Sequence, residues 1–197
     1  MRTSMYSVAA LCLAAMVMGC STTPKSAEAK EDLQGGAQRA VDRMTTADPD
    51  LRGVMDSSHG YAVFPKVGKG GLIVGGGYGR GIVYEQGAQI GYADITQATI
   101  GLQAGGQTFS ELLVFQNKEA LDRFRQNKLE FSANASAVIL KKGAAKAARF
   151  ENGVAIFIEP RAGAMAEASV GGQKFTFVSD AAAGGGATTR SSATTRP

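Results

Sequence analysis

Glycine divides the chain from residue 61 onward into short apolar segments, and this pattern limits what the chain can fold into. The segments are rich in β-branched and aromatic residues, which is typical of β-strands. They cover residues 61–64, 72–74, 81–84, 89–92, 111–115, 136–140, 154–158 and 175–178. Asn152-Gly153 and Gly171-Gly172 stand between such segments, where they favour hairpin turns. The pattern predicts a mainly antiparallel β-sheet or a partly closed barrel.

Paired glycines also occur in a short motif that is repeated within the chain, which we call the echo. The motif Gly71-Leu72-x-x-Gly75-Gly76 recurs as Gly101-Leu102-x-x-Gly105-Gly106. The echo reflects either related β units or chance in a chain with 26 glycines among 197 residues. Glycine pairs within strands are expected where strands bend or where two backbones approach closely.

Helical patterns accompany the strands and make the predicted fold class α+β. Residues 28–46 form an N-terminal helical segment, interrupted by Gly35 and Gly36, whose balanced charges favour packing on the protein's own sheet over membrane binding. Its apolar stripe consists of Leu33, Ala37, Ala40, Val41 and Met44. Asp48-Pro49-Asp50 is a strong signal for the start of a short second helix. Asn117 caps an inserted helix, in which Leu121 and Phe124 point inward.

The N-terminus has the features of a bacterial lipoprotein signal. Arg2 precedes an apolar run of 11 residues, 8–18, which is too short to span a bilayer. The run ends in Val17-Met18-Gly19-Cys20, which resembles a lipobox, so we expect cleavage before Cys20 and lipidation of its sulfur; an ordinary secretory signal is the alternative. Ser21 in place of an aspartate favours sorting to the outer membrane. The protein is thus predicted to be lipid-anchored in the cell envelope, on the periplasmic face of the outer membrane.

These signals divide the chain into four parts. Residues 1–19 are predicted to be the signal peptide, 20–27 a tether, 28–180 the folded domain and 181–197 a disordered tail of small and polar residues. Cys12 leaves with the signal and Cys20 is acylated, so the mature chain is expected to lack disulfides and a cysteine nucleophile.

The residue types argue against catalysis, metal binding and nucleic-acid binding. His59 is the single histidine, so no His/Cys metal cluster is expected. Ser57, Ser58 and His59 are sequence neighbours and lack a nucleophile elbow, so we expect no catalytic triad. Glu85, Asp94 and Glu111 are isolated acids, more typical of turn capping or ion pairing than of acid–base chemistry. A net charge of +4 is too small for a nucleic-acid-binding protein, and no cofactor is predicted.

The glycine-rich stretch 68–81 is the main candidate for ligand binding. Eight of its fourteen residues are glycine, and its backbone amides could hold a phosphate if it is a loop. Lys66, Lys69 and Arg80 would add positive charge for a phospholipid headgroup. Alternatively, these glycines only let strands bend and pack. A second basic cluster could face an anionic membrane or form a solvated turn: Lys141, Lys142, Lys146 and Arg149.

Several blocks in a fixed order resemble the SYLF domain. They include Gly60-Tyr-Ala-Val-Phe-Pro-Lys66, the glycine-rich stretch 68–81, Ile90-Gly-Tyr-Ala-Asp94 and the run from Thr99 to Phe115. The similarity continues through Asn134-Ala-Ser-Ala137 to Gly171-Gly-Gln-Lys-Phe175 and covers about residues 30–178. The resemblance implies a lipid-binding module, because eukaryotic members bind phosphoinositides and some bind actin. Actin is not an expected partner in a bacterial envelope.

The combined prediction is a non-enzymatic envelope lipoprotein that recognises anionic phospholipid headgroups. Its expected partners are membrane lipids. A structural or protein-interaction lipoprotein with a partner in the envelope is one alternative. A periplasmic carrier with an apolar lipid cavity is another.

Overall fold

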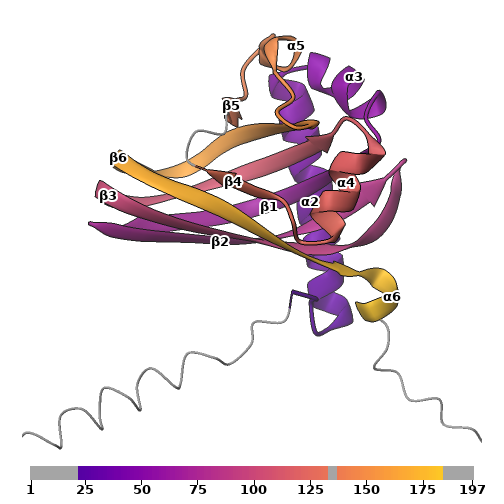
Figure 1. The fold of residues 1–197 in the computed structure, drawn as a ribbon, viewed down its shortest axis with the longest axis horizontal. Helices are drawn as coiled ribbons and strands as arrows, with labels where there is room; N and C mark the ends of the chain where they lie inside the picture. The colour runs from indigo at the N-terminus through magenta and orange to yellow at the C-terminus, as the bar shows by residue number, and fades with distance from the viewer. Residues whose placement is uncertain (1–21, 133–136, 184–197) are drawn as a thin grey trace, which may run out of the picture.

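A computed structural model describes residues 22–132 and 137–183 (Figure 1). The helices are α2 (Ala27–Ala47), α3 (Asp50–Asp56), α4 (Lys118–Arg125), α5 (Ala144–Ala147) and α6 (Asp180–Ala183). The strands are β1 (Gly60–Gly71), β2 (Val74–Glu85), β3 (Ala88–Phe115), β4 (Glu130–Ser132), β5 (Ala137–Ile139) and β6 (Val154–Ser179). The predicted α+β class is confirmed. Of the helices described, none has the length and apolar character that a membrane crossing requires.

The sheet is built around two long strands, β3 and β6, which pair with each other in antiparallel fashion. The first half of β3 also pairs with β2 and its second half pairs with β1, while β1 and β2 form a hairpin. β4 pairs with β6 in antiparallel fashion and β5 pairs with β6 in parallel. The described strands therefore form a curved, mainly antiparallel sheet that does not close into a barrel (Figure 1). This confirms the first of the two predicted forms, a sheet or a partly closed barrel.

One end of this sheet is covered by helices on both faces, and we call it the helix end. On one face, Ala120, Leu121 and Phe124 of α4 pack against the sheet. On the other face, α2, α3 and α5 supply Ala37, Ala40, Met44, Leu51 and Ala145. Strand residues alternate between the two faces: Leu113 and Phe115 contact the α4 side, and Leu112 and Val114 contact the α2 side. Burial on both faces explains why these segments are continuous apolar runs in the sequence.

A bulge at Pro65 separates the helix end from the rest of the strands. The register of β1 shifts here against both β2 and β3, at a residue that cannot donate a ladder hydrogen bond. The carbonyl of Pro65 accepts a hydrogen bond from Ser110 Oγ (3.0 Å), which in turn accepts one from Arg43 Nη2 of α2 (3.1 Å). Arg43 Nε also lies 3.1 Å from Glu159 Oε1 of β6. This network joins α2 to three strands where the helix cover ends.

Beyond the bulge, β1, β2, β3 and β6 continue past the helices to the opposite end of the molecule (Figure 1). We call this the tip end. It contains the turn between β1 and β2, at Leu72 and Ile73, and the adjoining part of β3 around Ile100. The prediction of a strand at 72–74 was therefore wrong, because two of its three residues form the turn.

The two predicted hairpin turns had different outcomes. Asn152 and Gly153 form a tight turn in which both residues have positive φ, 51° and 78°, and Glu151 pairs with Val154 across it. Gly171 and Gly172 instead lie within the continuous strand β6, opposite Thr99 and Ala98 of β3, so the second prediction was wrong. Helix α6 extends three residues beyond the predicted domain boundary at 180, while residues 1–21 and 184–197 lie outside the described residues.

Candidate functional site

The tip end carries four large apolar side chains that are exposed to solvent. Leu72, Ile73 and Val74 are 70%, 70% and 69% exposed, and Ile100 is 70% exposed. Val74 and Ile100 are direct partners in the β2–β3 pairing, so the four residues adjoin one another. We call them the apolar tip. Aliphatic side chains of this size are normally buried, so a cluster this exposed is a candidate contact surface.

Glycine shapes the turn that presents the apolar tip. A Cβ atom on Gly71 would lie 2.4 Å from the Cα atom of Gly75, its partner across the hairpin. Gly71 and Gly70 also pair with Gly105 and Gly106 of β3. The two copies of the echoed glycine motif thus meet side by side, at a place where three strand segments approach one another closely.

The glycine-rich stretch 68–81 forms the two strands of this hairpin, so it is not a loop. A Cβ atom on Gly79 would lie 2.8 Å from Val67 Cγ2, and one on Gly81 would lie 2.4 Å from the carbonyl oxygen of Val63. Gly79 pairs with β1 and with β3, and Gly81 pairs with β3, so their backbones belong to the sheet. The alternative interpretation, close strand packing, accounts for these glycines, whereas a phosphate cradle built from loop amides does not.

The hairpin holds the three predicted headgroup residues, but on different faces. Lys66 is exposed and lies directly opposite Arg80, so both side chains project from one face. Lys69 lies opposite Gly77 and Gln107 and is partly buried on the other face. The structure thus brings Lys66 and Arg80 together and separates both from Lys69.

Arg80 belongs to a cluster with Tyr78 and Asp94. Its Nε lies 3.3 Å from Asp94 Oδ1, and its Nη2 donates to Tyr78 Oη at 3.1 Å. The Tyr78 hydroxyl donates to the same carboxylate oxygen at 2.9 Å, and burial together with this bond raises the pKa of Tyr78. The carboxylate of Asp94 therefore offsets the charge of Arg80. Lys66 and Lys69 are the other two basic residues of the hairpin, which has no Asp or Glu between residues 57 and 84.

The helix end carries the single histidine in an ion-pair cluster. His59 Nε2 lies 2.9 Å from Glu85 Oε1, and Arg125 Nη1 of α4 lies 3.5 Å from Glu85 Oε2. The hydroxyls of Ser57 and Ser58 donate to the carbonyls of Val54 and Met55 in α3. These hydroxyls are used to end a helix and are not directed at His59. Within the described ranges, no group of three His, Cys, Asp or Glu residues could hold a metal ion.

Glu111 is a fully buried acid that the sequence pattern did not distinguish from other isolated acids. Its Oε2 accepts a hydrogen bond from Gln173 Nε2 (3.2 Å), while its Oε1 has no hydrogen-bond partner among the described residues. Burial raises the pKa of Glu111 to about 8. The carboxyl is therefore mainly protonated at neutral pH, inside the core between β3 and β6.

A groove of about 690 Å³ lies at the helix end, between α2, α3 and the β1–β2 pair. Two stacked rings, Tyr61 and Tyr84, line it, with centroids 4.9 Å apart. Other lining residues are Gln38, Val41, Arg52 and Met55.

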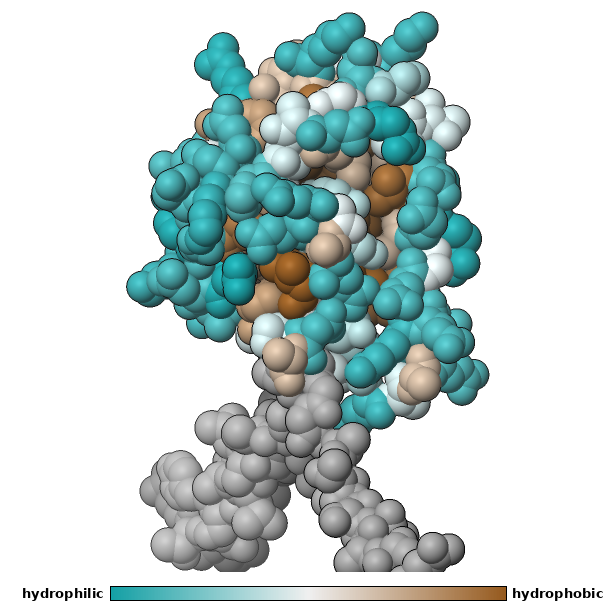
Figure 2. Space-filling model, turned by 90° about the vertical axis from the view of Figure 1, so that its right-hand side faces the viewer, coloured by the Kyte–Doolittle hydropathy of each residue, from teal (hydrophilic) through white to brown (hydrophobic). Residues whose placement is uncertain are grey.

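Figure 2 views the molecule from the side opposite the apolar tip and shows mainly hydrophilic residues, with small apolar patches in the hollows.

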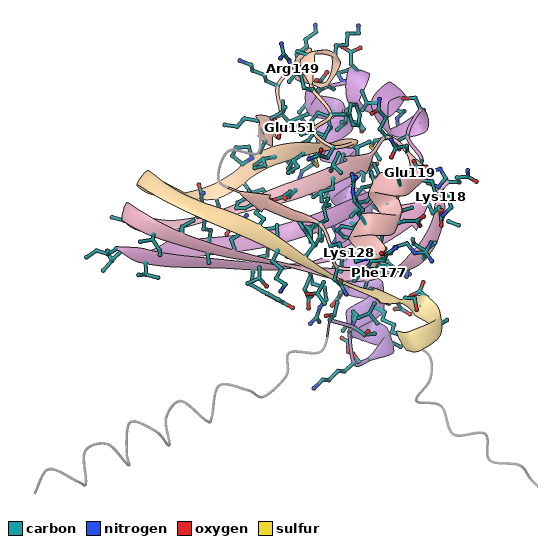
Figure 3. All side chains as sticks on the ribbon, viewed as in Figure 1. Lys118, Glu119, Lys128, Arg149, Glu151 and Phe177 are labelled. Carbon is teal, nitrogen blue, oxygen red and sulfur yellow. The ribbon has the colours of Figure 1, made fainter. Side chains whose placement is uncertain are left out.

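The second predicted basic cluster lies around α5, near α3. Lys141, Lys142 and Arg149 are exposed, and Figure 3 shows Arg149 at the edge of the molecule, above the sheet. Lys146 Nζ lies 3.0 Å from Asp50 Oδ1 of α3. This surface is well separated along the strands from the apolar tip, so it is a distinct candidate for contact with an anionic partner.

Comparison with known proteins shows a similarity to one family over the second half of the chain. Residues 96–184, from the middle of β3 to α6, match the Ysc84 family, described as "Las17-binding protein actin regulator". The match confirms the resemblance to the SYLF domain that the sequence blocks indicated, and similarity to this family is consistent with a role in lipid binding or protein interaction.

A relative extends the similarity over more of the chain. Beta cell expansion factor A of Aeromonas veronii is 26% identical over 159 residues. These residues are 80% of this chain and 60% of that protein, so the present chain spans only part of its relative's length.

Proposed function

We propose that this protein is a non-enzymatic lipid-binding protein that docks on an anionic phospholipid surface with its tip end. The observation that carries the proposal is the β1–β2 hairpin, which extends past the helices and combines a stretch without Asp or Glu, residues 57–84, with exposed Lys66 and an exposed apolar turn. The resemblance to the SYLF domain, which implies lipid binding, supports it.

The placement of the two lysines favours docking of the hairpin end-on. Lys66 and Lys69 project from opposite faces, so a flat contact with either face would use one of them. A hairpin that meets the membrane with its turn would bring both lysines close to the headgroups. Each lysine near an anionic surface contributes about 1 kcal/mol to binding. In this proposal Lys66 and Lys69 contact headgroups, and Arg80, which pairs with Asp94, makes a smaller contribution.

The lipobox sequence supplies the second element of the proposal. Acylation of Cys20 would anchor the protein in the bacterial envelope, by our proposal on the periplasmic face of the outer membrane. The tether is short, since α2 begins at Ala27. The folded domain would then be held close to the bilayer, where even a weak tip contact is effective because its local concentration is high.

Vesicle cosedimentation tests the proposal. Residues 22–197 contain every helix and strand that the structure describes, and they lack both the signal and Cys20. We expect binding to vesicles of phosphatidylcholine and phosphatidylglycerol that weakens as salt is added, and little binding to phosphatidylcholine alone. Lys66→Glu combined with Lys69→Glu should weaken binding at least tenfold.

Matched charge reversals decide which surface docks. Lys128→Glu reverses one charge, as either hairpin substitution alone does, at an exposed position after α4, far from the turn, and should leave binding nearly unchanged (Figure 3). Lys141→Glu with Lys142→Glu tests the basic cluster near α5. If that pair abolishes binding while the hairpin variant binds normally, the docking surface is wrong. If no vesicle binds even at low salt, the proposed function is wrong.

A protein-interaction role is the second candidate, and the groove at the helix end favours it. Its size and its stacked tyrosines would suit a side chain or short segment of an envelope protein. Retention of a specific envelope protein that is lost in Met55→Arg, together with absent vesicle binding, would favour this role over the first.

The described core argues against the carrier alternative. Phe64, Phe115, Phe124 and Phe175 are fully buried and fill the space between α4 and the curved sheet. The ring centroid of Phe124 lies 5.0 Å from that of Phe115 and 5.7 Å from that of Phe175. Packing of this kind leaves the described interior occupied by side chains where an acyl chain would have to bind.

A further inference from the structure

We propose that the apolar tip, formed by Leu72, Ile73, Val74 and Ile100, inserts into the hydrocarbon edge of the bilayer. This inference rests on the proposed membrane docking and adds the depth and orientation of the contact. Of the six large hydrophobic residues that are exposed in the described chain, four belong to the tip. The remaining two, Tyr78 and Ile139, lie elsewhere, so the exposure is concentrated where the hairpin ends.

The hairpin is narrow behind the apolar tip. Gly70 and Gly71 precede the turn, and Gly75 and Gly76 follow Val74, so no polar side chain from β1 or β2 adjoins the four apolar residues. Such a turn can enter a lipid surface without drawing polar side chains of these strands into hydrocarbon. The cost of burying polar groups is what normally prevents shallow insertion of a β-hairpin.

Positive charge lies at the depth that insertion requires. Lys69 precedes Leu72 by three residues, which is about 10 Å along a strand. Interfacial segments bury their apolar side chains about 5–10 Å below the headgroups. With the turn in the hydrocarbon, Lys69 would therefore reach the phosphate level, and Lys66 would lie about 10 Å further from the bilayer centre, at the outer side of the headgroups. One acidic residue, Glu167, has its backbone opposite Gln103 at this end.

A bilayer fits the apolar tip better than a second protein does. The tip is a small convex turn made of four side chains, whereas a stable protein interface buries about 1,200–2,000 Å² in total. A lipid surface adapts to a small protrusion, and the lysines behind it match anionic headgroups. A second copy of this chain would place the same positive hairpin against itself.

Tryptophan fluorescence tests the insertion, because the chain contains no tryptophan of its own. Ile73→Trp places a reporter on the apolar tip, and Ile139→Trp places one at an exposed residue of β5, which is 63% exposed and pairs with the helix end of β6. On residues 22–197 bound to vesicles containing phosphatidylglycerol, we expect a blue shift for Ile73→Trp. We also expect strong quenching by acyl-chain bromination for Ile73→Trp and neither effect for Ile139→Trp.

Loss of the apolar side chains should weaken binding without removing its salt dependence. Leu72→Ser combined with Ile73→Ser should lower affinity at least tenfold. Because the residues are exposed, the thermal unfolding temperature should stay unchanged and report an intact fold. Normal affinity in this double variant would overturn the insertion. A loss of self-association in place of vesicle affinity would identify the tip as an interface between copies and would also overturn it.

The results separate this inference from the proposed function. Vesicle binding with an unshifted, unquenched Ile73→Trp signal contradicts insertion and leaves headgroup docking standing. Quenching of Ile139→Trp alone shows that another face meets the bilayer. Absence of binding by every variant and by the unmodified chain contradicts the proposed function itself.

Discussion

The helix end and the tip end are built from the same four strands, β1, β2, β3 and β6, but they differ in whether their large apolar side chains are buried or exposed. At the helix end, α2 and α4 cover both faces, and residues such as Phe115 and Leu112 are fully buried. At the tip end the hairpin has glycine on both sides of the turn, and Leu72 and Ile73 are left in solvent. Stability therefore depends on the helix end, while the tip end is available for contact with a partner.

Truncation of a large side chain gives the strongest contrast between the two ends. Phe124→Ala removes the ring that contacts Phe115 and Phe175, and it should lower the free energy of unfolding by about 3–5 kcal/mol. Leu72→Ala removes a smaller apolar group from a solvent-exposed position and should change stability by less than about 0.5 kcal/mol. Chemical denaturation measures both. Comparable losses for the two variants would contradict the division of roles.

The buried Glu111 makes the stability of the core depend on pH. Its pKa is raised from 4.5 to about 8 in the folded protein, so between these values the folded state holds a proton that the unfolded state has released. The contribution of Glu111 to stability should be constant below pH 4.5 and fall as the pH rises towards 8. The fall should amount to a few kcal/mol, since each unit of pKa shift corresponds to about 1.4 kcal/mol.

Glu111→Gln provides the control for this pH dependence. The amide keeps the shape and the contact with Gln173 but cannot titrate, so denaturation midpoints measured from pH 5 to pH 9 should become flatter. If the variant and the unmodified protein lose stability in parallel, another group is responsible.

Glycine-to-alanine substitutions distinguish two kinds of glycine in the hairpin: those packed against neighbouring atoms and those with open space where a Cβ atom would lie. Gly79→Ala places a Cβ 2.8 Å from Val67 Cγ2 and 3.1 Å from Ile95 Cγ2, and should cost about 1–3 kcal/mol. Gly68→Ala meets nothing within 4 Å and should be neutral or slightly stabilising. Thermal unfolding of the pair checks this. Equal effects would mean that close packing is not the reason for glycine at position 79.

The sequence predicted the helix end well because its physical signals are local. The stripe that includes Ala37, Ala40 and Met44 has helical spacing, and these residues are buried in α2. Asn117 caps α4 as expected, by accepting a hydrogen bond from the backbone N–H of Ala120. Gly35 and Gly36 lie inside α2 without ending it, because its buried stripe outweighs their low helix propensity.

The tip end could not be predicted as well, because long-range pairing determines it. β3 and β6 extend through glycine-rich and polar stretches, including Gly171 and Gly172, because each strand is held by its neighbour along its whole length. Lys66 and Lys69 are close in the sequence, but the strand residues that they oppose place them on different faces of the hairpin. The run Leu72-Ile73-Val74 between glycine pairs was the available signal for an exposed turn. Nothing local marked Glu111 as buried.

The most direct test of the central claim is a depth measurement on two nitroxide labels. Residues 22–197 contain no cysteine, so Leu72→Cys and Ile139→Cys each give a single labelling site. On vesicles containing phosphatidylglycerol, the account predicts that the label at position 72 becomes accessible to oxygen and protected from a water-soluble nickel complex, while the label at position 139 stays in water. A label at position 72 that remains as accessible to nickel as the one at position 139 would contradict it.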